Sequence, residues 1–107
     1  MSKRPDVYLE LALRALERVP RFLAGRSLEA YLADDLCQSA VERQLEVAGD
    51  ALGQVRKLDL DLFARVPEGA LLSRFATCWD DAATNKVDEL IRTIHVLLRE
   101  LPEDPAA

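Results

Sequence analysis

The chain has 107 residues, a net charge of −5 at pH 7, and only four glycines and five prolines. This length fits one domain with a single core, and a hydrophobic content of 50% excludes a disordered chain. The acidic balance excludes general electrostatic attraction to nucleic acid, so any RNA contact needs a local basic patch.

The first predicted helix covers residues 6–24, with Asp6 as its N-cap. Pro20 lies inside this pattern and predicts a kink or an interruption of the helix. A second, short helix over residues 28–33 follows, with Ser27 as its N-cap.

The central predicted helix covers residues 35–58 and is the segment around which the fold is expected to be organised. Its apolar positions fill about half of the helical wheel, which predicts packing by more than one neighbour. These positions are Leu36, Cys37, Ala40, Val41, Leu45, Val47, Ala48, Ala51, Leu52, Val55 and Leu58. Gln44 lies in the middle of this apolar half, where a buried amide needs hydrogen-bond partners. Two interpretations stay open: a satisfied core amide, or a binding site formed by Gln44 with Arg43.

The same helix carries Gly49 and Gly53 on its polar half, four positions apart. They leave a smooth strip on which another backbone could pack. The strip indicates either packing relief within the domain or, together with the wide apolar face, a homodimer contact.

A short helical turn is expected next, in which Leu60, Phe63 and Val66 cover the end of the core. Pro67 and the glycine that follows it then break the chain. A further helix is predicted over residues 70–80, with its apolar residues on one side.

The last predicted helix covers residues 85–101 and begins at Asn85. Its core stripe consists of Val87, Leu90, Ile91, Ile94, Leu97, Leu98 and Leu101. Because no strand pattern occurs, the sequence predicts an all-α, up-and-down bundle of four to five helices. The single domain has its core at about residues 7–101, and residues 102–107 are expected to fray.

Residues suited to catalysis are few. His95, the one histidine, falls at the edge of the last core stripe, which is typical of a boundary residue. Glu42, Glu46 and Asp50 share a helical face, but no second set of ligands completes a metal site. We therefore expect no metal and no cofactor.

The two cysteines, Cys37 and Cys78, fit neither a metal spacing nor a disulfide framework, which is typical of a reducing compartment. The first residues lack the apolar core of a signal peptide, and no apolar run reaches membrane-spanning length. We therefore expect a cytoplasmic protein that does not associate with membranes.

Two stretches, LAGRSLEAYLAD (residues 23–34) and AVERQLEVAGDA (residues 40–51), resemble the HepT-like family. That family belongs to the HEPN superfamily of small helical-bundle ribonucleases, and its members are typically encoded beside a minimal nucleotidyltransferase, as toxin and antitoxin. The resemblance covers residues 7–101. It implies a helical bundle, a homodimer and a nucleotidyltransferase partner.

The ribonuclease motif of the family departs from its pattern here. It consists of Arg, usually followed by Asn, then four to six residues, His, and a Tyr two positions further. Arg74 matches the arginine, but Phe75, Trp79 and Asp81 stand at the Asn, His and Tyr positions. Tryptophan cannot exchange a proton near neutral pH as histidine does. The resemblance therefore implies a degenerate motif and a non-catalytic binding module, with Phe75 and Trp79 expected to be buried.

Two alternatives stay open. One is an active ribonuclease toxin in which Arg74 works with a substitute acid, Asp80 or Asp81, although the net charge disfavours RNA binding. The other is a subunit that binds a nucleotide or another polar ligand near Gln44 and Arg74.

Overall fold

The computed structural model describes residues 4–66 and 81–100; in the last helix, side chains are described from Val87 onward. The first helix, α1, covers Pro5–Leu23. Pro5 suits a helix start because its fixed φ is helical. Its missing N–H costs nothing there, because the first N–H groups of a helix have no partner within the helix. The predicted N-cap was wrong: Arg4 is the capping residue. Asp6 lies in the first turn, where hydrogen bonds from the Arg4 guanidinium hold the pKa of its carboxyl below the usual value.

Helix α1 continues through Pro20, so the predicted interruption was wrong. Pro20 lies in the last turn, where its missing amide hydrogen costs the helix a single bond, while Val19 and Leu23 are buried in the core. The helix ends at Ala24, which adopts a left-handed φ of 47° and donates its N–H to the Pro20 carbonyl at 3.0 Å.

The predicted N-cap Ser27 is confirmed, and the next helix has a cap of the same kind. Helix α2 covers Leu28–Leu32, and the Ser27 hydroxyl accepts the N–H of Ala30 at 3.1 Å. Helix α3 covers Asp35–Leu58, and Asp34 accepts the N–H of Cys37 at 3.0 Å. Both caps are local features of the sequence, although only Ser27 was predicted.

Helix α3 contacts α1, α2 and α4, as its wide apolar face predicted. Its buried side is narrower than the apolar half of the wheel and consists of Cys37, Val41, Leu45, Ala48, Ala51, Leu52 and Val55. Leu36 is 82% exposed and Leu58 is also exposed. Gln44 is half-buried, so its predicted position inside the core was wrong. A side chain added at Gly53 would meet nothing within 4 Å, so packing within the described residues does not require this glycine.

Helix α4 covers Leu60–Ala64 and begins where Asp59 accepts the N–H of Leu62 at 3.0 Å. Leu62 and Val66 are buried, whereas Leu60 is 63% exposed. The expectation that Leu60 covers the core was therefore wrong. The Arg56 guanidinium lies over the Phe63 ring, 5.9 Å from its centroid, at the junction of α3 and α4.

The last helix, α6, covers Asp81–Glu100 and begins four residues before the predicted start at Asn85. Its buried residues, Val87, Leu90, Ile94 and Leu97, follow the predicted stripe. Arg65, just after α4, forms an ion pair with Glu100 at the other end of the chain. The helix predicted over residues 70–80 and the position of Leu101 lie outside the described residues.

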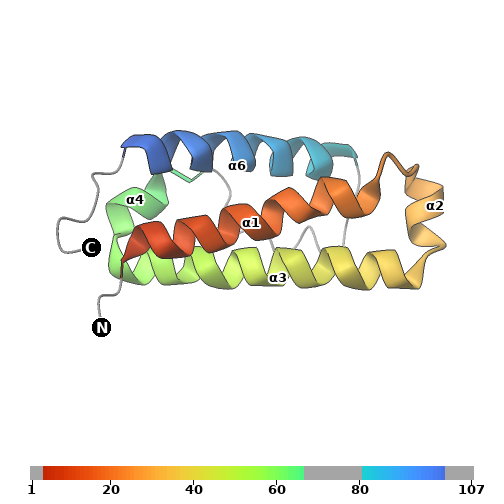
Figure 1. Cartoon of the computed structure of the whole chain (residues 1–107), viewed down its shortest axis with the longest axis horizontal. Helices are drawn as coiled ribbons and strands as arrows, with labels where there is room; N and C mark the ends of the chain where they lie inside the picture. The colour runs from red at the N-terminus through yellow and green to blue at the C-terminus, as the bar shows by residue number, and fades with distance from the viewer. Residues whose placement is uncertain (1–3, 67–80, 101–107) are drawn as a thin grey trace.

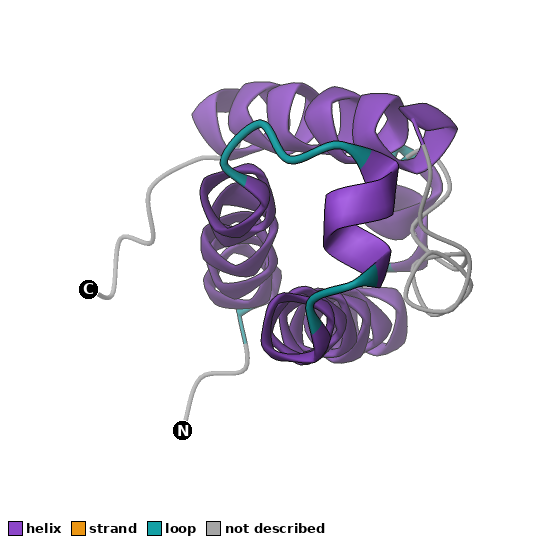
Figure 2. Cartoon of the chain, turned by 90° about the vertical axis from the view of Figure 1, so that its right-hand side faces the viewer, coloured by secondary structure: helices purple, strands orange, loops and turns teal. Residues whose placement is uncertain are grey.

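Helix α1 runs between α3 and α6 and contacts both (Figure 1). The buried residues from these elements form one continuous core. Figure 2 shows only helices and connecting loops in the described ranges, which confirms the predicted all-α helical bundle. No helix within the described ranges has both the length and the apolarity needed to cross a membrane.

Helix α3 carries two leucines that form a matched pair for a stability test. Leu45 is fully buried and Leu36 is almost fully exposed on the same helix. We expect Leu45→Ala to lower the free energy of unfolding by about 2–5 kcal/mol, because it opens a cavity in the core. Leu36→Ala should change it by less than about 0.5 kcal/mol. Urea denaturation followed by circular dichroism measures both, and equal losses would contradict the described packing of α3.

Candidate functional site

Most of the residues of the predicted ribonuclease motif cannot be placed. Arg74, Phe75 and Trp79 lie outside the described residues, as does the alternative acid Asp80. Asp81 is the first residue of α6, but its side chain is also outside the described part. The candidate site must therefore be built from the remaining predicted residues and their neighbours.

Gln44 connects α3 to α1. Its Oε1 accepts a hydrogen bond from Nη1 of Arg18 at 3.2 Å. The amide is therefore satisfied, as one interpretation predicted, but at an exposed edge of the α1–α3 contact. Arg43, the other predicted binding residue, forms an ion pair at 3.5 Å with Glu46 on the exposed surface of α3. Within the described part of the chain, no hydrogen bond or ion pair joins the Arg43 side chain to Gln44 or Arg18.

Three arginines of α1 share one face with Arg18 at their centre. Arg14, Arg18 and Arg21 are spaced four and three residues apart, which places their side chains one above another on a helix. We call them the arginine row. With Glu17 they line a pocket of about 320 Å³, the arginine pocket. This row was not among the residues predicted from the sequence, although its spacing opposite the apolar stripe of α1 was a usable signal.

The charges of the row are unevenly neutralised. Arg14 lies between two carboxylates, 2.8 Å from Glu10 and 3.7 Å from Glu17. Among the described residues, the hydrogen-bond partner of Arg18 is the neutral amide of Gln44, and no carboxylate forms an ion pair with it. Arg21 is exposed and has no ion-pair or hydrogen-bond partner in the described part of the chain. Positive charge therefore remains uncompensated towards the C-terminal end of the row.

His95 lies beside this pocket, on α6. Its side chain is 49% exposed, as expected of a boundary residue, and its Nε2 is 3.7 Å from Oε2 of Glu17. Among the described side chains, neither group has a hydrogen bond to a serine, threonine or cysteine, so the pair resembles no activated nucleophile. Among the side chains of residues 4–66 and 87–100, no three acidic, histidine or cysteine groups lie together so that they could hold a metal ion.

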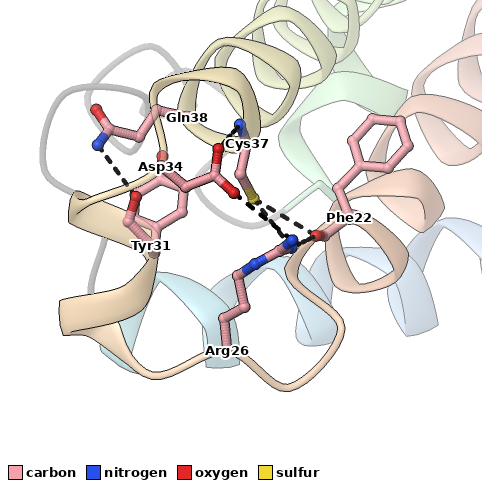
Figure 3. A network of polar contacts seen from close by, with 6 residues as sticks. All are labelled: Phe22, Arg26, Tyr31, Asp34, Cys37 and Gln38. Carbon is pink, nitrogen blue, oxygen red and sulfur yellow. Dashed lines mark hydrogen bonds and ion pairs between the residues drawn. The ribbon is translucent and has the colours of Figure 1, made fainter.

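A second polar cluster joins α1, α2 and α3 at one end of the bundle (Figure 3). Its residues are Phe22, Arg26, Tyr31, Asp34, Cys37 and Gln38. Arg26 donates to the Phe22 carbonyl and lies 3.6 Å from the Asp34 carboxylate. The Cys37 thiol donates to the same carbonyl at 3.4 Å. These bonds satisfy a carbonyl in the last turn of α1 that has no partner further along the helix.

The α2 side of this cluster has the same role. Gln38 donates from Nε2 to the Tyr31 carbonyl at 3.1 Å and to the Leu32 carbonyl at 2.7 Å. Tyr31 is buried, and this burial raises the pKa of its phenol, with the Glu42 carboxylate adding to the effect. The cluster thus binds the helix ends of the fold to one another, and none of its buried polar atoms is left without a partner. It is a structural corner rather than a ligand site.

Cys37 is buried and free of any disulfide, as expected of a cysteine acting as a small hydrophobic residue. Cys78 lies outside the described residues. Comparison of the chain with protein-family models, curated proteins and solved structures gives no match. The site must therefore be interpreted from its own chemistry.

The corner can be tested with two arginines that differ in their contacts. Arg26→Ala removes bonds to a helix-end carbonyl and to Asp34, so we expect a loss of about 1 kcal/mol in the free energy of unfolding. Arg43→Ala removes only an exposed pair within α3 and should cost less than about 0.5 kcal/mol. Chemical denaturation of both variants measures the difference. A neutral effect of Arg26→Ala would show that the corner does not stabilise the fold.

Proposed function

We propose that this chain is a HepT-like helical binding module that forms a homodimer and lacks ribonuclease activity. The proposal takes its family from the sequence resemblance and its loss of activity from the chemistry of the motif. A minimal nucleotidyltransferase is the proposed partner, because members of the resembled family are typically encoded beside one. The identity of the adjacent gene tests this part directly.

The observation that carries the loss of activity concerns the only histidine. Metal-independent RNA cleavage needs a group that exchanges a proton near neutral pH. The motif position for that group is Trp79, and the single histidine stands 21 positions after Arg74 in the sequence. The His95 Nε2 lies 3.7 Å from a carboxylate oxygen of Glu17 in α1, which places the histidine at the α1–α6 edge.

The homodimer is supported by apolar side chains that the described fold leaves uncovered. Leu28 and Leu32 of α2 and Leu36 of α3 are exposed, and they follow one another at four-residue spacing. We call these three residues the leucine patch. Covering such side chains is favourable by about 25 cal/mol per Å² of apolar area. A second copy of the chain is the occupant that the resemblance implies.

Purified protein should not cleave single-stranded RNA or transfer RNA. We expect the cleavage rate to equal that of a buffer control and to be unchanged in Arg74→Ala. The measurement is gel analysis of labelled RNA after prolonged incubation. Cleavage that persists through repeated purification and disappears in Arg74→Ala would favour the active-toxin alternative instead.

Light scattering coupled to size exclusion should give about twice the chain mass of 12.0 kDa at micromolar concentration. Leu32→Lys combined with Leu36→Lys should shift the protein towards monomer if the leucine patch is the dimer interface, because dimerisation would then desolvate two lysines. Both positions are exposed, so the fold should be retained. A wild-type monomer would contradict the proposed homodimer. A variant that remains dimeric would show that the dimer interface does not include Leu32 and Leu36.

A further inference from the structure

The arginine row keeps like charges close together without enough carboxylates to neutralise them. On a helix, side chains four residues apart are neighbours, and like charges at this spacing repel one another. Arg14 is neutralised by Glu10 and Glu17, but Arg18 contacts an amide and Arg21 contacts no described carboxylate. An anion in the pocket would relieve this repulsion.

The helix dipole accounts for only part of the row. A cation in the last turn of a helix is favoured by the partial negative charge there, and Arg21 lies in that turn. The effect falls off within one turn, so it does not explain Arg14 or Arg18. Their positions on the same face as Arg21, around one hollow, are the feature that indicates a ligand.

We propose that the arginine pocket binds a compact ligand carrying a di- or triphosphate group. Guanidinium groups present planar pairs of N–H donors that match two phosphate oxygens, and such charge-assisted bonds are stronger than neutral ones. Arg18 and Arg21 provide the free donors, and the ion pairs with Glu10 and Glu17 hold Arg14 beside them. The phosphates can be inorganic or can belong to a nucleotide.

Size and charge favour a compact ligand over a long nucleic acid strand. The pocket volume of about 320 Å³ is at the small end of the range of ligand sites. Glu10 lies at the N-terminal end of the row, Glu17 lines the pocket itself, and the chain as a whole carries a net charge of −5. A strand extending past Arg14 would therefore meet Glu10, whereas a short polyphosphate can contact Arg18 and Arg21 alone.

Isothermal titration calorimetry of the full chain tests the proposal with pyrophosphate, ATP, adenosine and a ten-residue oligouridylate. We expect saturable binding of pyrophosphate and ATP, weakened by added salt, and no binding of adenosine. Arg18→Gln combined with Arg21→Gln should weaken both by about ten-fold or more, because charge-assisted bonds are lost. Circular dichroism checks that the variant remains folded, as expected for exposed positions.

The matched control is Arg56→Gln combined with Lys57→Gln, which removes two positive charges from the last turn of α3. We expect its affinities to equal those of the wild type. Equal weakening by both double variants would indicate unspecific attraction and overturn the proposal. So would the absence of saturable binding by pyrophosphate and ATP, or binding of oligouridylate alone. The proposal does not depend on the homodimer or on the loss of ribonuclease activity.

Discussion

Helix α1 packs against α3 along one side and against α6 along another, and this double contact is the constraint on which the described fold depends. Seven of its residues are buried, from Leu9 to Leu23. Fully burying a large aliphatic side chain contributes about 1.5–3 kcal/mol, so α1 is a major source of stability. The sequence pattern pointed to the residues of α3 as the organising helix, because their apolar face is the widest. In the structure, however, α1 is the helix that contacts both other long helices, although its apolar face is narrower than that of α3.

The same constraint determines which side chains α1 can offer to a ligand. With two sides buried, the remaining strip of the helix faces solvent, and the arginine row occupies the C-terminal part of this strip. A protein with a net charge of −5 thus presents a local basic surface beside Gln44 and His95. This surface is consistent with a role in binding a small anionic ligand.

Several features that depend on local sequence were predicted, and several that depend on packing were not. Ser27 accepts the N–H of a residue three positions ahead, so the pattern alone identified it as an N-cap. The helix through Pro20 was missed because buried Val19 and Leu23 outweigh one lost hydrogen bond. Gln44 was predicted in the core because a helical wheel shows which half of α3 is apolar. It does not show how far across this half the packed contact with α1 extends.

The candidate site was predicted only in part for the same reason. Gln44 was selected from the sequence, but its partner Arg18 is 26 positions earlier and is brought to it by the α1–α3 contact. His95 was expected at a boundary, and its pairing with Glu17 likewise requires the α1–α6 contact. No pattern within one helix encodes either pair, so both contacts became visible only in the folded chain, whereas the arginine row follows from spacing within α1.

Native-state hydrogen exchange measured by NMR tests most directly whether α1 is the central packing element. The account predicts that amides in the buried middle of α1, such as Leu13 and Leu16, exchange only by global unfolding. Their protection should then equal the free energy of unfolding and match that of Leu45 and Leu52 in α3. Exchange of the α1 amides through a local opening, while those of α3 stay protected, would contradict the account.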